Sequence, residues 1–96
     1  MALQVFYSDR ARDTARQVYN FILVKFGKKA AGDFKIKLEN TIQSISEFPY
    51  IFKASGLDET IRIGLITRQT SVVYEVRDDT IYLHYFWDNR QEPMIS

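Results

Sequence analysis

Three short runs of alternating apolar residues in the last third of the chain constrain the fold most strongly. A period of two is typical of β-strands, and the last two runs are separated only by a short turn at Asp78 and Asp79, which favours an antiparallel hairpin. Thr60 to Pro93 is therefore predicted to form a β-meander with a basic, aromatic end. The runs are Ile61–Ile66, Val72–Arg77 and Ile81–Phe86.

Two amphipathic stretches precede the meander. In the first, apolar residues recur every three or four positions from Ala11 to Phe26, after Ser8, whose side-chain oxygen can cap a helix start. In the second, the same spacing runs from Ala31 to Phe48 and stops before Pro49, which disfavours helix in the residue before it. So short a connection between two long helices predicts an antiparallel helical hairpin.

The order of these elements predicts an α+β fold, β-α-α-β-β-β, in a single domain over residues 1–96. Leu3–Tyr7 alternates and supplies the first strand. We expect an antiparallel, twisted sheet packed on one face by the helical hairpin. The loop Pro49–Glu59 shows no clean period. Its apolar residues are expected to plug the open end of the core: Tyr50, Ile51 and Phe52.

The turn at Asp78 and Asp79 assigns each later side chain to one face of the sheet, because side chains alternate strictly across the pleat. Val76 is expected opposite Ile81, Tyr74 opposite Leu83, and Val72 opposite Tyr85, all facing the helices. No helix remains to cover the second face. That face is expected to carry Arg62, Val73, Glu75, Arg77, Tyr82, His84 and Phe86.

Composition excludes several kinds of site. The chain has no cysteine and one histidine, so thiolate chemistry and a histidine-rich metal site are excluded, and no metal or other cofactor is expected. A net charge of +1 is weak for a protein that binds many phosphates and favours a protein partner. No basic, apolar leader or membrane-length apolar run is present, so the cytoplasm is the expected location.

Four segments together resemble the RelE/ParE superfamily of toxins from bacterial type II toxin–antitoxin systems, over Val5 to Pro93. They are "VFYSDRARD", "A..F...L...I.SI..FP", "IRIGLI.....VVYEVRDDTIYLHYF" and "FWDNRQEP". The last looks like the "[FHW]xxRxxP" ending of ParE-type members, also described as plasmid stabilisation proteins. The resemblance implies a sheet cradled by a helical hairpin, growth inhibition, and neutralisation by a cognate antitoxin that wraps around the domain.

The two branches of this superfamily differ in their targets. RelE-like members cut ribosome-bound mRNA without a metal, whereas ParE-like members act on DNA gyrase without hydrolysis. Here Ser71 occupies a position where RNase-type members carry arginine, and the chain ends at Ser96, before the segment that would supply their tyrosine. The sequence thus favours a non-catalytic, ParE-like toxin. The alternatives are an RNase with an altered catalytic set, for which His84 and Arg90 are the weak candidates, and a fold that has lost toxicity.

The uncovered sheet face and the loop Thr67–Thr70 are predicted to dock the antitoxin and, in its absence, the target. Tryptophan and arginine near the sheet end are residue types enriched in interface hot spots. Each of these features also has a purely structural interpretation. Trp87 would close the core, the arginines would form ordinary salt bridges, and Lys28-Lys29 and Lys35–Lys37 would face solvent. The oligomeric state is open, a dimer included. The expected binding residues are Arg62, Arg68, Arg77, Tyr82, His84, Phe86, Trp87 and Arg90.

Overall fold

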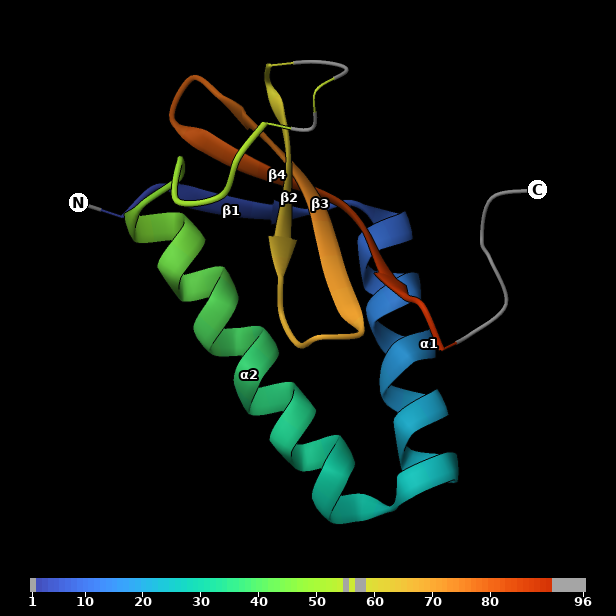
Figure 1. Cartoon of the computed structure of the whole chain (residues 1–96). Helices are drawn as coiled ribbons and strands as arrows, with labels where there is room; N and C mark the ends of the chain where they lie inside the picture. Colours follow the sequence, from blue (N-terminus) through green and yellow to red (C-terminus); the bar gives the residue numbers. More distant parts are fainter. Residues whose placement is uncertain (1, 55, 57–58, 91–96) are drawn as a thin grey trace.

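A computed structural model describes residues 2–54, 56 and 59–90, so Gln91–Pro93 of the closing segment and part of the loop after Pro49 lie outside the described residues. The predicted α+β fold and its element order are confirmed. Figure 1 shows two helices that meet at one end and diverge toward the sheet. The elements are β1 (Gln4–Tyr7), α1 (Asp9–Phe26), α2 (Lys28–Glu47), β2 (Ile61–Leu65), β3 (Thr70–Arg77) and β4 (Thr80–Asp88).

Both helices begin and end close to where the sequence predicts. The Ser8 side chain accepts a hydrogen bond from the Ala11 amide at 3.0 Å and caps α1. Gly27 lies between the helices with φ +96°, a conformation that residues with a side chain rarely adopt. Within the described part of the chain, neither helix is long and apolar enough to cross a membrane.

The sheet is mixed rather than wholly antiparallel. Its strand order is β1-β4-β3-β2, and β1 pairs with β4 in parallel while the meander strands pair antiparallel. The two helices, β2 and β3 all lie between β1 and β4 in the chain, which provides the long connection that a parallel pair requires. The start of β1 is tied to the end of α2, because the Ser46 hydroxyl donates to the Leu3 carbonyl at 2.8 Å.

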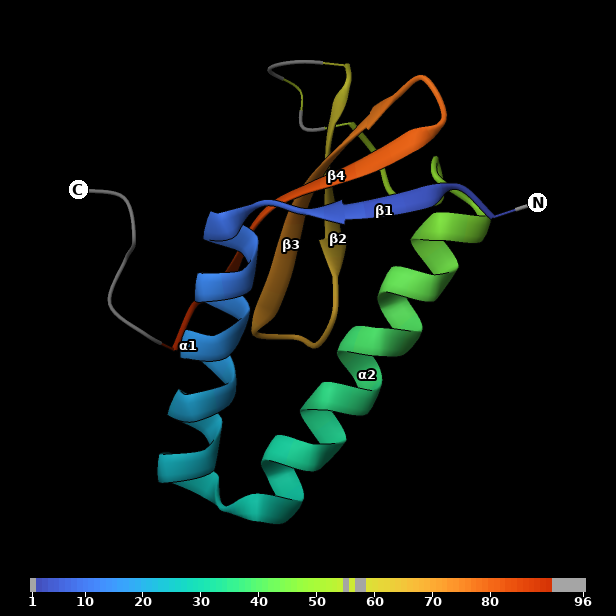
Figure 2. The same cartoon turned by 180° about the vertical axis from the view of Figure 1, so that it is seen from behind.

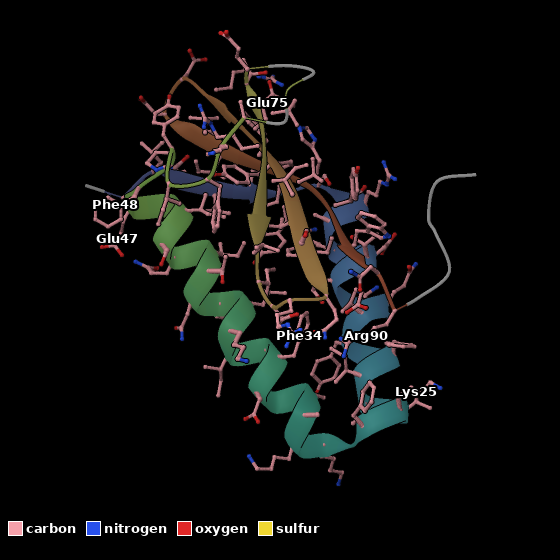
Figure 3. The ribbon with its side chains drawn as sticks, in the orientation of Figure 1. Lys25, Phe34, Glu47, Phe48, Glu75 and Arg90 are labelled. Carbon is pink, nitrogen blue, oxygen red and sulfur yellow. The ribbon has the colours of Figure 1, made fainter. Side chains whose placement is uncertain are left out.

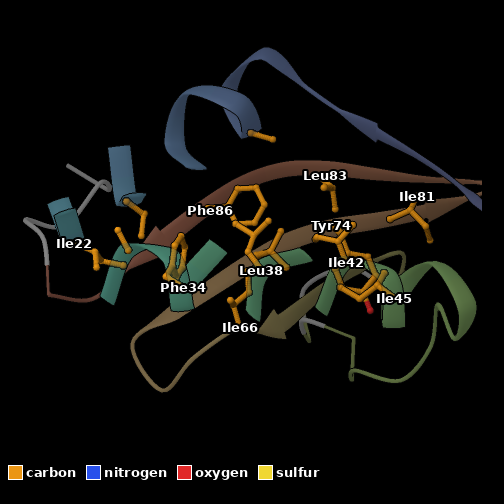
Figure 4. Close-up of a cluster of buried hydrophobic side chains, with 14 residues drawn as sticks. Ile22, Phe34, Leu38, Ile42, Ile45, Ile66, Tyr74, Ile81, Leu83 and Phe86 are labelled. Carbon is orange, nitrogen blue, oxygen red and sulfur yellow. The ribbon is translucent and has the colours of Figure 1, made fainter. Parts of the chain in front are cut away.

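A β-bulge in β4 changes which side chains enter the core. Tyr74 pairs with Leu83 as predicted, but Val73 pairs with Tyr85, so His84 is an extra residue in β4. An extra residue reverses the alternation beyond it. The prediction that Phe86 lies on the uncovered face is therefore wrong: Phe86 pairs with Val72 and is 0% exposed. Figure 4 shows it among the buried side chains.

Strand β2 turns the opposite face inward from the one predicted. A Cβ at Gly64 would lie 3.0 Å from the Phe52 ring and 3.3 Å from Ile45, so this position must approach the helix layer without a side chain. Arg62 pairs with Tyr74 and therefore also lies on the helix side, which corrects its predicted place on the uncovered face. Ile63 and Leu65 point the other way and are 46% and 59% exposed.

The loop after α2 contributes less to the core than expected. Phe52 packs against the buried cluster, but Tyr50 and Ile51 are exposed. Arg62 joins this region to the sheet: its Nη1 donates to the Phe52 carbonyl at 2.6 Å, and its guanidinium lies 4.7 Å from the centre of the Tyr50 ring. The predicted plug is therefore Phe52 alone, with Tyr50 serving as a platform for Arg62.

Candidate functional site

The sheet has one face without a helix, because both helices lie against the other. Strand register brings apolar and aromatic side chains from all four strands together on this surface, which we name the open face. It includes the exposed Ile63 and Leu65, which the sequence had assigned to the core. Its residues are Phe6, Ile61, Ile63, Leu65, Ser71, Val73, Glu75, Arg77, Tyr82, His84, Tyr85 and Trp87.

A polar cluster built around Glu75 occupies the middle of the open face. Arg77 donates through Nε and Nη2 to the two Glu75 carboxylate oxygens, both at 3.1 Å. His84 Nε2 lies 3.0 Å from Glu75 Oε1. The hydrogen bond from Arg77, with help from His84, lowers the pKa of Glu75 even though burial raises it. Strict alternation after Leu83 already places His84 on this face, and the bulge adds Tyr85 beside it.

Aromatic rings flank the polar cluster. Tyr82 meets Phe6 edge to face at a centroid distance of 5.8 Å, and the Arg77 guanidinium lies 4.8 Å from the centre of the Tyr82 ring. Beyond the end of β1, Arg10 of α1 lies 4.1 Å from the centre of the Tyr85 ring. Trp87 pairs with Ser71 and is 37% exposed, so it lies outside the core.

Helix α1 takes over from β1 as the neighbour of β4 after the bulge. The Ser8 hydroxyl donates to the His84 carbonyl at 2.9 Å, and the Phe86 amide donates to the Thr14 hydroxyl at 2.8 Å. These bonds satisfy backbone groups that β1 is too short to reach. The orientation of the open face is thereby fixed to the first turns of α1.

The sequence-predicted binding residues separate into three groups. Arg77, Tyr82, His84 and Trp87 come together on the open face. Arg68 is exposed in the β2–β3 turn, which the Thr67 hydroxyl closes by accepting from the Gln69 and Thr70 amides at 3.2 and 3.1 Å. The third group, which lies away from the open face, consists of Arg62, Phe86 and Arg90.

Arg90 belongs to a structural cluster centred on Asp88, a carboxylate that sequence reasoning missed. Asp88 is 0% exposed. Arg90 donates to it through Nε at 2.9 Å and Nη2 at 2.6 Å, and the Thr70 hydroxyl donates at 2.5 Å. The Arg90 guanidinium also faces the Phe21 and Phe26 rings of α1, at 5.7 and 5.4 Å from their centres. Figure 3 shows Arg90 beside α1, well separated from Glu75.

The Asp88 cluster predicts a loss of stability in acid. Burial raises the pKa of Asp88, but the bonds from Arg90 and Thr70 together lower it below the ordinary aspartate value. A depressed folded-state pKa contributes stability that is complete above the unfolded pKa of about 3.9 and is lost as pH falls through the folded value. We expect the urea concentration at which half of the wild type is unfolded to decrease once the pH falls below about 4.

The same measurement on Asp88→Asn separates this carboxylate from the others. The variant should be less stable at pH 7 and should lose less further stability between about pH 5 and pH 3. Glu75→Gln is the comparison, because the pKa of Glu75 is also lowered but its cluster lies at the surface. If Asp88→Asn keeps the full acid dependence of the wild type, Asp88 is not its source.

The chemistry available on the open face is limited by its internal pairing. Catalysis of RNA cleavage requires preorganised positive charge around a developing phosphorane. Here Arg77 is bound to Glu75 and Arg10 lies over Tyr85, while Arg90 is committed to Asp88 elsewhere. The contact between His84 and Glu75 is the arrangement on this face that most resembles an acid–base pair. Recognition of another protein is the function that the remaining surface favours.

Comparison with known proteins places the chain in a family. No curated protein is similar enough in sequence to match it. It shares its fold with the chromosomal ParDE toxin–antitoxin system from P. aeruginosa, at 11% identity and a TM-score of 0.75, covering 91% of this chain and 96% of that one. It also resembles a copper-bound mutant toxin from Helicobacter pylori, at 17% identity and a TM-score of 0.60, covering 92% of this chain and 96% of that one. The sequence model of the ParE toxin of the ParDE type II toxin–antitoxin system matches residues 5–93, so the chain belongs to the ParE toxin family.

Proposed function

We propose that this toxin inhibits growth by binding a protein target in the cytoplasm, with DNA gyrase as the candidate, and that a cognate antitoxin neutralises it. The observation that carries this proposal is the open face itself, an aromatic and aliphatic surface whose central charges are already paired. Large exposed apolar patches rimmed by polar groups mark protein interaction sites. Aromatic and arginine side chains dominate the binding energy of such interfaces.

The paired charges argue for binding rather than catalysis. Arg77 would have to leave both Glu75 oxygens before it could hold a phosphate. Arg68 is exposed, but it stands in the β2–β3 turn, apart from the polar cluster. A partner that covers Ile63, Leu65 and Trp87 buries apolar surface without breaking any ion pair of the toxin, because these side chains are already exposed.

We predict that substituting residues of the open face strongly weakens partner binding without unfolding the toxin. The double variant Tyr82→Ala and Trp87→Ala should bind the antitoxin at least about 30-fold more weakly, since a hot-spot truncation costs about 2 kcal/mol or more. The affinity can be measured by titration calorimetry, and toxicity by growth after induction. The matched control is Val24→Ala, an exposed apolar residue on α1. Equal affinities for the control and the double variant would reject the open face as the docking surface.

The second candidate function is a metal-independent endoribonuclease of RelE type, acting on ribosome-bound mRNA. The observation that favours it is the 3.0 Å separation of His84 Nε2 and Glu75 Oε1, which would orient the ring and leave Nδ1 free to accept a proton. Arg90 has no place in such a site, because it is bound to Asp88.

Two assays distinguish the candidates. Inhibition of gyrase supercoiling without mRNA cleavage supports the binding toxin. Cleavage of ribosome-bound mRNA that is lost in His84→Gln, while antitoxin affinity is retained, supports the nuclease. Arg77→Lys, which keeps the charge but not the two-pronged contact, serves as the control for a general effect on the cluster.

A further inference from the structure

The charges of the toxin are unevenly distributed, although the formal net charge is only +1. In Figure 3, Lys25 and Arg90 lie near the end where the two helices meet, whereas Glu47 and Glu75 lie toward the other end. We name the helical end, together with the β2–β3 turn that reaches toward it, the basic end. Its exposed cations come from the last turn of α1, the first half of α2 and the β2–β3 turn. They are Lys25, Lys28, Lys29, Lys37 and Arg68.

A hollow of about 310 Å³ brings these segments together. Phe26 at the end of α1, Lys37 of α2 and Thr67 of the β2–β3 turn all line it. Figure 2 shows the turn reaching from the sheet toward the gap between the two helices. Arg68 follows Thr67 in the turn and is exposed. Cations that are distant in sequence therefore lie on adjoining parts of one surface.

Most cations of the basic end have no ionic partner inside the toxin. Lys29 contacts Asp33 at 3.3 Å, but both side chains are more than half exposed, so this pair holds the lysine weakly. Among the residues that the structure describes, Lys28, Lys37 and Arg68 take part in no salt bridge. An anionic partner would therefore meet available positive charges.

The start of α2 carries positive charge where a helix favours negative charge. Its first two residues are Lys28 and Lys29, its first turn has no acidic residue, and no side chain caps it. The amino end of a helix dipole is positive, so lysine there lowers helix stability and a nearby anion raises it. Helix α1 follows the usual pattern instead, with Ser8 as its cap and Asp9 in its first turn. The contrast agrees with the unpaired cations in favouring an external anion.

The residue types at the basic end favour phosphate over a protein surface. Lysine is depleted in protein interfaces, whereas arginine and aromatic residues, which the open face carries, are enriched there. Lysine binds phosphate as a point charge. Single-stranded nucleic acid requires aromatic rings on which its bases can stack. Phe26 is 55% exposed, but its ring centre already lies 5.4 Å from the Arg90 guanidinium and 6.4 Å from the Phe21 ring. A duplex, with closely spaced phosphates on two strands, suits this surface better.

We propose that the basic end binds the phosphate backbone of duplex DNA, as a contact separate from the open face. The choice of DNA over duplex RNA rests on the proposed function, because gyrase acts on DNA and brings a toxin bound to it close to a duplex. Few cations take part, so the contact should be weak, with a Kd of about 1 to 100 μM at physiological salt. It would hold the toxin near DNA without replacing the protein contact at the open face.

The test is the fluorescence anisotropy of a labelled DNA duplex of mixed sequence, titrated with the full-length toxin at several salt concentrations. For the wild type, the logarithm of the affinity should fall with the logarithm of the salt concentration with a slope of about −3 to −4, since each neutralised phosphate contributes about −0.9. The triple variant Lys28→Glu, Lys37→Gln and Arg68→Gln should bind at least about tenfold more weakly at low salt, with a slope near about −1.

The matched control makes the same three kinds of substitution at exposed positions outside the basic end: Lys53→Glu, Lys35→Gln and Arg12→Gln. Lys35 lies two residues before Lys37 on α2, and residues two apart on a helix do not share a face. This triple variant has the same net charge as the first. It should keep the salt slope of the wild type and lose less than about threefold in affinity.

The single variant Lys28→Glu separates DNA binding from a role in folding. An acidic residue in the first turn of α2 favours the helix, so the melting temperature should rise while the affinity for the duplex falls. A lysine that served only the fold would not give these opposite changes. Equal duplex affinities for Lys28→Glu and the wild type would remove α2 from the contact and contradict the proposal.

The outcomes also separate this inference from the proposed function. If the wild type does not bind the duplex at low salt, or if the two triple variants weaken binding equally, the assignment of the basic end is wrong, and antitoxin binding and gyrase inhibition still test the proposed function. Tighter binding to single-stranded DNA or to duplex RNA than to the DNA duplex would also overturn the proposal. If the basic-end variant loses DNA binding and the wild type does not inhibit gyrase, the proposed function fails and the DNA contact stands.

Discussion

Replacing Phe86 with alanine is expected to lower the free energy of unfolding by about 3 to 5 kcal/mol. The ring is fully buried, pairs across the sheet with Val72 and stacks on Tyr7 at a centroid distance of 6.4 Å. Its removal leaves a cavity between β4 and the helices that close packing cannot refill without strain. Urea unfolding followed by circular dichroism measures the change, with Phe86→Leu as a milder variant if the alanine form does not fold.

The matched control is Tyr85→Ala, one residue earlier in β4. Tyr85 lies on the open face beneath Arg10, so its truncation should cost about 1 kcal/mol or less. Strict alternation from the turn at Asp78 and Asp79 would reverse the two results, because it places Tyr85 inside and Phe86 outside. A larger loss in Tyr85→Ala than in Phe86→Ala would show that β4 has no bulge at His84.

Replacing Asp88 with alanine is expected to cost about 3 kcal/mol, because it removes one partner from a buried ion pair. Three groups would lose their acceptor at once: the Arg90 side chain, the Arg90 amide and the Thr70 hydroxyl. Since Thr70 begins β3 and Arg90 rests on the aromatic rings of α1, the carboxylate joins the β2–β3 turn to the helical hairpin. Equilibrium unfolding at pH 7 is the measurement.

The control for Asp88 is Asp13→Ala, which removes the carboxylate of an exposed pair with Arg16. Its cost should stay below about 0.5 kcal/mol, as is usual for surface pairs. A double-mutant cycle with Arg90→Ala tests the partnership, and the two single losses should add to more than the loss in the double variant. Full additivity would mean that Asp88 and Arg90 stabilise the fold independently.

The residues of the closing segment, Phe86 to Arg90, therefore have two different roles. Trp87 points outward on the open face, whereas Asp88 and Arg90 hold the sheet against α1. The sequence alone indicates a binding or catalytic arginine at this place, yet the Arg90 guanidinium is occupied inside the fold. Arg90 lies in the turn after β4, and its spacing from Asp88 was the available signal, because an aspartate side chain in a turn commonly accepts from the backbone amide two residues on.

The sequence by itself determined the element order, the helix ends at Ser8 and Gly27, and the hairpin at Asp78 and Asp79. These features depend on local chemistry: hydrophobic period, capping oxygens and glycine conformation. The resemblance to RelE/ParE toxins also came from motif order alone. The capping, turn and periodicity signals each lie within a few neighbouring residues, and the order of the motifs follows the chain, so none of them depends on contacts between distant segments.

Only the tertiary structure decided which side chains form the open face. The bulge at His84 depends on β1 being too short to pair with all of β4, so that Ser8 and Thr14 of α1 satisfy the remaining backbone groups. The inward orientation of β2 depends on Phe52 and Ile45 occupying the space beside Gly64. Both features depend on contacts between segments distant in sequence. Each of them reverses the face of the sheet that the alternating pattern assigns to the side chains concerned. For that reason the sequence predicts the sheet correctly but places Phe86 and Arg62 on its exposed face. In the structure, Tyr85 and Ile63 lie there instead.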